Sequence, residues 1–136
     1  MNKAFFINAE TREIVSVELS KENALAECYE LIGCSIVEGI YTFNEYGECD
    51  NNQLIFDEEG LFKEGKSGFY FKPHINEDGW FIYGNAVIWG FDTHGYIADA
   101  NYQINDIESR LTWVDKEMAE SIRNSKLNTI PQVFSW

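Results

Sequence analysis

Apolar and polar residues alternate along much of this chain, and the alternation predicts short antiparallel strands. In residues 13–19, Val15, Val17 and Leu19 alternate with polar positions, as expected for a half-buried strand. Other runs are dense in β-branched and aromatic residues, which pleated sheets favour. Together these patterns predict strands over residues 4–8, 13–19, 33–43, 68–72 and 80–91.

Two stretches follow a helical spacing instead. In the first, Ser20 is a suitable N-cap and Gly33 is placed to end the helix in the left-handed conformation. Apolar residues recur between them every three or four positions, at Leu25, Cys28, Tyr29 and Ile32. A second helix is predicted after Asp115, running to about Asn124. Before it, residues 107–113 alternate and favour a strand, although they could also extend the second helix backwards.

A recurring four-residue pattern, with Asp or Asn first and Gly last, separates the predicted strands. It occurs at residues 44–47, 57–60, 76–79 and 92–95, each time directly after an apolar residue. The first side chain can accept hydrogen bonds from backbone amides, and the glycine can take the positive φ that closes a hairpin. Each occurrence therefore predicts a reversal between antiparallel strands.

These elements predict an antiparallel α+β fold. We expect a hairpin-rich curved sheet with one helix after the second strand and a C-terminal helix. The length of 136 residues suits a single domain, in which residues 101–136 form a C-terminal strand, helix and tail. The tail is apolar at Ile130, Pro131, Val133, Phe134 and Trp136. We expect it to dock on its own sheet, and the alternative is a contact with a partner or with a second copy in a homodimer.

Several segments resemble a known family. They are the opening hairpin around residues 7–14, the helix end at 31–33, the strand at 35–38, the turn at 56–60 and above all residues 83–95, YGNAVIWGFDTHG. These are similar to the small phage and mobile-element proteins grouped as domain of unknown function 3846, over about residues 3–100. The resemblance implies a phage, prophage or plasmid origin and brings no established catalytic residues.

Negative charge is concentrated in one part of the chain. The sequence has 23 acidic and 10 basic residues, a net charge of −13, and residues 22–62 hold ten carboxylates without a single Lys or Arg. The chain is 45% apolar and 15% aromatic, which is too rich for a disordered acidic tail, so the charge decorates a folded surface. Such a field repels nucleic acids and anionic membranes and attracts basic surfaces.

The charge predicts a non-catalytic binding protein that engages a basic surface of a host protein, in the manner of a nucleic-acid mimic active in anti-defence or host takeover. The candidate binding residues are Glu45, Glu48, Asp50, Asp57, Glu58 and Glu59. The bland alternative is that the charge only serves solubility. Glycine-rich phosphate loops and basic clusters are missing from the sequence, so neither direct nucleic-acid binding nor membrane binding is expected.

An alternative function is binding of a small, nucleotide-like ligand by an oligomer. Asn85 interrupts an apolar run and could aim its amide at a ligand, although an amide that holds a neighbouring loop is the commoner arrangement. Arg110 would supply charge for a phosphate, together with Arg123 of a second subunit. Four aromatic residues could stack on a base or bind a peptide, namely Trp80, Tyr83, Trp89 and Tyr96, but at least half of them should be core.

Catalytic and metal-binding signals are weak. His94 sits at a predicted turn tip without a recognisable nucleophile, and the segment from His74 lacks the ligands of a calcium loop. The cysteines at 28, 34 and 49 lack the spacing of a zinc site and are expected to be core thiols. We therefore expect no enzyme activity, metal or cofactor. The N-terminal apolar run is too short for a signal peptide, which favours a cytoplasmic location.

Overall fold

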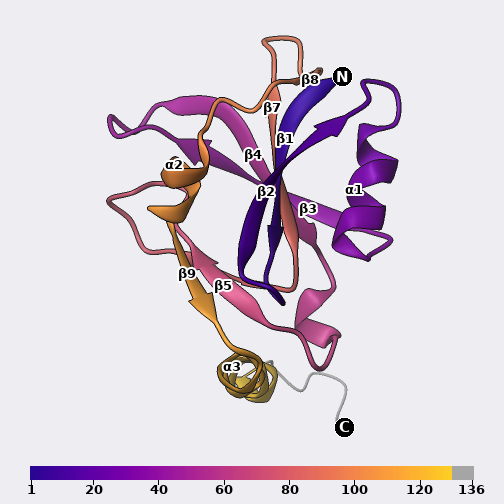
Figure 1. Ribbon diagram of the computed structural model, residues 1–136. Coiled ribbons are helices and arrows are strands. Elements are labelled where there is room, and N and C mark those ends of the chain that lie inside the picture. The colour runs from indigo at the N-terminus through magenta and orange to yellow at the C-terminus, as the bar shows by residue number, and fades with distance from the viewer. Residues whose placement is uncertain (130–136) are drawn as a thin grey trace, which may run out of the picture.

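The computed structural model describes residues 1–129 and confirms an antiparallel α+β fold (Figure 1). The strands are β1 (Asn2–Asn8), β2 (Glu13–Leu19), β3 (Val37–Phe43), β4 (Cys49–Asp57), β5 (Gly68–Phe71), β6 (Trp80–Tyr83), β7 (Ala86–Phe91), β8 (Ile97–Ala98) and β9 (Leu111–Val114). The helices are α1 (Ala24–Ile32), α2 (Ile104–Glu108) and α3 (Lys116–Thr129), with a 3-10 turn η1 (Gly60–Phe62). As predicted, one helix follows the second strand and another follows the last described strand.

The strands form two open sheets where the sequence predicted one. The larger sheet has the order β2-β1-β7-β4-β3, with β8 paired to the end of β7, and the smaller sheet has the order β6-β5-β9. All of these pairs are antiparallel. Because β7 lies between β1 and β4, distant parts of the chain meet at the centre of the larger sheet.

The larger sheet lies between α1 on one face and the smaller sheet on the other (Figure 1). On the first face, Cys28 and Ile32 of α1 pack against Ile55 and Val87. On the second face, the core contains Phe5, Ile7, Leu54, Phe69, Phe71, Ile82 and Ile88. Helix α1 has only nine residues, about 13 Å of helix, so it covers only part of its face of the sheet.

The predicted strand over residues 80–91 is in fact two strands in different sheets. The chain leaves β6 at Gly84, where φ is +87°, and enters β7 at Ala86. The Gly84 N–H donates to the carbonyl of Ser67 at 2.7 Å, and the Asn85 amide oxygen accepts the Ala9 N–H at 2.8 Å. The residues on both sides of Gly84 and Asn85 are apolar because both strands are largely buried, and this similarity hides the change of sheet.

Three of the four predicted reversals join paired strands, namely β3–β4, β5–β6 and β7–β8. In the first and third, Asn44 and Asp92 accept backbone N–H groups, and Gly47 and Gly95 have φ values of 80° and 82°. The β5–β6 reversal is held differently, because a backbone N–H at its start donates to the ring of His74. The pattern thus predicted the positions of three reversals correctly. It predicted the hydrogen bonds and the glycine conformation of only two of them.

The fourth prediction, a hairpin at residues 57–60, is wrong. Strand β4 ends at Asp57, whose carboxylate accepts the Glu59 N–H, and the chain then continues through η1 to β5 in the other sheet. A Cβ at Gly60 would lie 3.1 Å from the carbonyl oxygen of Tyr83. The glycine therefore permits a close approach to β6 rather than a turn with positive φ.

The helix predictions need two corrections at their N-terminal ends. Helix α1 begins at Ala24, and Ser20 lies before it, where its hydroxyl accepts the Asn23 N–H and donates to Glu27. The left-handed cap at Gly33 is confirmed, with φ of 81°. Residues 107–113 are neither one strand nor part of the second helix, because residues 104–108 form α2 and the strand begins only at Leu111.

The C-terminal helix follows Asp115 as predicted, and it continues past residue 124 to the end of the described chain. The Asp115 carboxylate accepts the Met118 N–H at 2.8 Å, as an N-cap should. The prediction that residues 130–136 dock on the sheet or on a partner concerns residues outside those described. Strand β4 was not predicted from its own composition, because it begins with the polar run CDNNQ.

Candidate functional site

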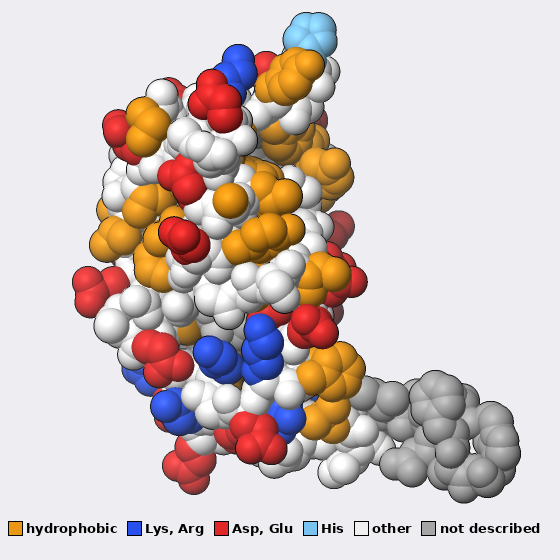
Figure 2. Space-filling view, turned by 90° about the vertical axis from the view of Figure 1, so that its right-hand side faces the viewer, with side chains coloured by type: hydrophobic (Ala, Val, Ile, Leu, Met, Phe, Trp, Pro, Cys, Tyr) orange, Lys and Arg blue, Asp and Glu red, His pale blue; other side chains and the backbone are white. Residues whose placement is uncertain are grey.

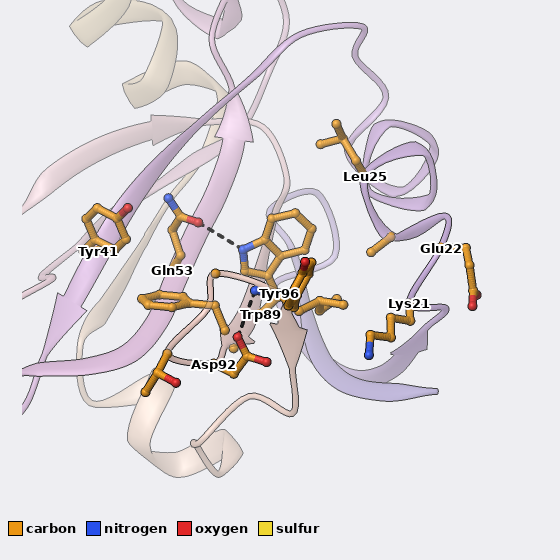
Figure 3. Close-up of a pocket in the computed structure, with 14 residues that line it drawn as sticks. Lys21, Glu22, Leu25, Tyr41, Gln53, Trp89, Asp92 and Tyr96 are labelled. Carbon is orange, nitrogen blue, oxygen red and sulfur yellow. Dashed lines mark hydrogen bonds between the residues drawn. The ribbon is translucent and has the colours of Figure 1, made fainter.

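A groove of about 500 Å³ lies on the α1 face of the larger sheet, over the part of that face that α1 does not cover (Figure 3). Its floor comes from β3, β4 and β7, one wall from the start of α1, and one end from the β7–β8 hairpin. The lining side chains used below are Lys21, Glu22, Leu25, Tyr41, Gln53, Trp89, Phe91, Asp92 and Tyr96. We call this feature the aromatic groove.

The floor of the aromatic groove is a row of side chains across three neighbouring strands. Tyr41 on β3 pairs with Gln53 on β4, and Gln53 pairs with Trp89 on β7. Residues directly opposite each other in an antiparallel sheet point to the same face, so the pairing register alone brings the three together. The Trp89 indole N–H donates to the Gln53 amide oxygen at 3.1 Å.

Close packing fixes this row in place. A Cβ at Gly39 would lie 2.3 Å from the amide nitrogen of Gln53, so the missing side chain makes room for that amide. The rings of Tyr41 and Phe91 meet edge to face with centroids 5.5 Å apart. The aromatic groove therefore has a floor in which the Trp89 indole N–H is satisfied and the Tyr41 side chain is more than half exposed.

The rim of the aromatic groove carries both charge and exposed apolar surface. Tyr41 is 55% exposed, Tyr96 63% and Leu25 46%. The Lys21 ammonium lies 5.8 Å from the centroid of the Tyr96 ring, within the range of a cation–π contact. Figure 3 shows Lys21 and Glu22 on the α1 side of Trp89, with Tyr41 on the opposite side.

Asp92 closes one end of the aromatic groove as an ionised carboxylate. Its Oδ1 accepts the backbone N–H groups of His94 at 2.8 Å and Tyr96 at 3.0 Å. Partial desolvation opposes its ionisation, but these donors, with the nearby charges of His94 and Lys21, hold the pKa of Asp92 below its ordinary value of 3.8. The surroundings thus favour the charged form of Asp92.

Two of the six acidic residues predicted from sequence are engaged inside the protein. Asp57 is 8% exposed and forms an ion pair with Lys63 at 2.6 Å. Asp50 accepts hydrogen bonds from the hydroxyl groups of Thr42 and Tyr102. These bonds tie β3 and β4 to the segment before α2, so Asp50 and Asp57 both act in packing.

The other four predicted acidic residues are exposed but lie in two separate places. Glu45 and Glu48 are on the β3–β4 hairpin, at one end of β4, while Glu58 and Glu59 follow the other end. A strand of nine residues spans about 30 Å, so the two pairs are far apart. Figure 2, which faces the α1 side, shows acidic side chains scattered among hydrophobic ones rather than gathered in one patch.

Asn85 and Arg110, the residues of the small-ligand alternative, both hold backbone groups. The Asn85 amide accepts the Ala9 N–H, and the cavity beside it has only about 30 Å³, room for roughly one water molecule. Arg110 is 9% exposed, and its guanidinium donates to the carbonyls of Phe43 and Pro73 at 2.6 Å and of Lys72 at 3.3 Å. The structure does not bring Asn85 and Arg110 to one pocket.

The histidines and cysteines form no cluster with other ligands. Within residues 1–129 no group of three or more His, Cys, Asp and Glu side chains is placed to hold a metal ion. Cys28 is fully buried, and burial together with the charge of Glu27 raises the pKa of its thiol to about 12, so it is inert as a nucleophile. His94 is exposed at the tip of the β7–β8 hairpin.

Sequence reasoning had named two residues of the aromatic groove, Trp89 and Tyr96, as aromatic candidates. Of the four aromatic residues in that set, Tyr83 is buried, Trp89 is half-buried, and Trp80 and Tyr96 are exposed. The sequence did not identify Tyr41 or Gln53 as site residues, because their only sequence signal is an outward position in a strand.

Comparison with family models, curated proteins and solved structures found no match. The resemblance to domain of unknown function 3846 therefore stays a prediction. Among the helices of residues 1–129, none combines the length and apolar character needed to cross a bilayer.

Proposed function

We propose that this protein is a non-catalytic binding protein that holds a basic segment of another protein in the aromatic groove. The observation that carries the proposal is the row Tyr41–Gln53–Trp89, packed against Phe91 and left open by a short helix. Aromatic residues, Tyr and Trp above all, dominate the binding energy of protein interfaces. A preformed, partly exposed aromatic row therefore favours protein binding.

The charge around the aromatic groove favours a basic partner. Glu22 and Asp92 line it with one ammonium group, that of Lys21, and residues 22–62, which include Glu22, hold ten carboxylates without a basic residue. A field of this sign steers basic segments toward the surface and repels phosphate groups. If the chain is encoded by a phage or mobile element, as the resemblance implies, the partner is a host protein.

This proposal moves the binding site from the acidic residues themselves to the aromatic groove between them. Asp50 and Asp57 serve packing, so the remaining exposed carboxylates act through their long-range field. A nucleotide-like ligand is less well supported for two reasons. The Arg110 guanidinium already donates to three backbone carbonyls, and two carboxylates line the aromatic groove. Its phosphate would meet repulsion there.

The proposal is tested by affinity capture from a host lysate at about 50 mM and about 500 mM salt. The bait is the parent protein, with the Tyr41→Ala/Tyr96→Ala double variant alongside. Both side chains are more than half exposed, so the fold tolerates their loss. Tyr46→Ala is the matched control, since Tyr46 is 78% exposed on the β3–β4 hairpin, outside the aromatic groove.

We expect a protein that binds the parent and the control at low salt, is released by high salt, and is not captured by the double variant. Equal capture by all three baits would locate binding elsewhere and overturn the proposal. Capture that persists at high salt but requires the tyrosines would support the groove as the binding site and contradict the proposal that the partner is basic.

A further inference from the structure

We propose that the aromatic groove contains a subsite for an arginine side chain of the partner, formed by Trp89 and Tyr96 with Asp92 and Glu22, and that Lys21 occupies part of it in the free protein. This inference rests on the proposed function and specifies what the partner must present. It follows from which hydrogen bonds the groups at that end of the groove already make.

Of the two rings at this end, Tyr96 is exposed and Trp89 is half-buried. The one polar atom of the Trp89 side chain is used by Gln53, so an occupant would contact only the carbon atoms of the part of the indole that is exposed. Tyr96 is 63% exposed and already has a cation over its ring, the Lys21 ammonium at 5.8 Å. Aromatic faces attract cations through their quadrupole, and Trp is the strongest of them. The existing contact shows that the site accepts a positive charge.

Asp92 lies beside the rings where such a cation would bind, and Glu22 lies farther out on the rim, beyond Lys21 (Figure 3). Asp92 uses Oδ1 for both of its backbone bonds, and its Oδ2 makes no hydrogen bond within residues 1–129. Glu22 also lines the groove, and none of the three ion pairs within residues 1–129 includes it. A partner's guanidinium could therefore donate to Oδ2 of Asp92 while its plane stacks on a ring.

Arginine suits this combination better than lysine. Its guanidinium is planar and weakly hydrated, so it stacks on aromatic faces and still donates N–H groups in its own plane. An ammonium is compact and strongly hydrated and gains less from a flat ring. The Lys21 ammonium lies near the outer limit of a cation–π contact, so a better-matched cation can displace it along the exposed rim.

The test is an NMR titration of the full ¹⁵N-labelled chain with acetyl-Gly-Arg-Gly-amide. Its counterpart with citrulline has nearly the same shape without the charge. The chain has four Trp residues, and the indole N–H signal that disappears in Trp89→Phe identifies Trp89. We expect the arginine peptide to shift this signal and the citrulline peptide to leave it in place. Equal shifts from both peptides would overturn the subsite.

Variants of Lys21 and the rim give the sharper test. Because Lys21 competes with the incoming cation, Lys21→Ala should increase the affinity for the arginine peptide about twofold to fivefold. Tyr96→Leu should weaken it by a similar factor, and so should Glu22→Gln. Glu30→Gln on the outer side of α1 removes the same charge outside the groove and should change affinity by less than twofold. Weaker binding by Lys21→Ala would overturn the inference.

The outcomes separate this inference from the proposed function. If lysate capture needs Tyr41 and Tyr96 but the arginine and citrulline peptides behave alike, the groove binds a partner without an arginine subsite. If the arginine peptide shifts Trp89 specifically while capture is indifferent to the groove, the subsite stands and the proposed partner site is wrong.

Discussion

At the scale of single residues, Arg110 is the buried cation on which the junction of the two sheets depends. Its guanidinium joins carbonyls at the end of β3 and after β5, at Phe43, Lys72 and Pro73, and it lies 5.3 Å from the Tyr102 ring. Arg110→Met would keep the apolar stem but remove these three bonds, although the Pro73 carbonyl would still accept the Phe43 N–H at 2.9 Å. We expect the free energy of unfolding to fall by about 3 kcal/mol.

Urea denaturation measures this loss. Lys116→Met is the control, because it also removes one positive charge but its ammonium is exposed and makes only a 3.8 Å ion pair with Glu10. That control should cost less than about 0.5 kcal/mol. Equal costs for the two variants would show that net charge, rather than the bonds of Arg110, sets the stability.

Glu27 links the turn before α1 to the helix in a pH-dependent way. Hydrogen bonds from the hydroxyl and then the backbone N–H of Ser20 hold the pKa of Glu27 below its ordinary value of 4.5. A lowered folded-state pKa contributes stability above pH 4.5 that is lost as the pH falls through the folded pKa. Glu27→Gln should therefore be less stable than the parent at pH 7, and the gap should narrow at an acidic pH at or below the folded-state pKa.

Denaturation curves at the two pH values measure that gap. Glu30→Gln, a change on the same helix at an exposed position, should show no such narrowing. A Glu27→Gln deficit that stays constant between the two pH values would mean that the Ser20 bonds do not depend on the carboxylate charge.

At the scale of elements, the backbone at Asp99 lies so close to β7 that Gly90 has no room for a side chain. A Cβ at Gly90 would lie 2.2 Å from the carbonyl oxygen of Asp99, which cannot rotate away as a side chain can. Gly90→Ala should therefore lower the free energy of unfolding by about 2 kcal/mol or more. At Gly39 the obstacle is the end of the Gln53 side chain, so Gly39→Ala should cost about 1 kcal/mol or less.

Thermal unfolding ranks the two glycine variants, and NMR adds a second readout. In Gly39→Ala the Gln53 amide must move, which should shift the Trp89 indole N–H signal because that group donates to Gln53. In Gly90→Ala the unfolding temperature should fall further than in Gly39→Ala. The reverse ranking would mean that the loop around Asp99 yields more easily than a packed side chain.

The elements that the sequence predicted are those whose signals are local. The stripe that includes Cys28 and Ile32, the cap at Gly33 and the turn chemistry of Asn44 and Asp92 each depend on neighbours a few residues away. The change of sheet at Gly84 was not predicted, because only long-range pairing decides which sheet a buried strand joins. Strand β4 was missed because its polar half is held by bonds to distant residues.

The candidate site was predictable only in part for the same reason. Trp89 and Tyr96 are conspicuous in sequence as aromatic residues near a turn, whereas Tyr41 and Gln53 become site residues only through their register with β7. Which half of the sheet face stays open depends on the length and position of α1. No local pattern encodes that position, since it results from packing between α1 and the sheet.

At the scale of the whole molecule, the net charge is −13, and the acidic residues fall into two groups. Some repel one another at the surface, and others make bonds that stabilise the fold. The exposed residues Glu45, Glu48, Glu58 and Glu59 are not among the described hydrogen-bonded or ion-paired side chains. Changing all four to Gln should raise the free energy of unfolding by about 0.5–1 kcal/mol at low salt, because self-repulsion falls. The gain should vanish near about 1 M salt, where the Debye length is about 3 Å.

Asp57→Asn provides the contrast, because its partner charge is close and shielded. The Asp57 carboxylate is 2.6 Å from the Lys63 ammonium and also accepts the Glu59 N–H, so its loss should destabilise the protein at both salt concentrations. Denaturation of both variants at about 10 mM and about 1 M salt measures this. If the four-residue variant gained stability and also lost its captured partner, the same exposed carboxylates would both strain the fold and steer the partner. That pairing is what selection for binding, rather than for stability, would leave on an acidic surface.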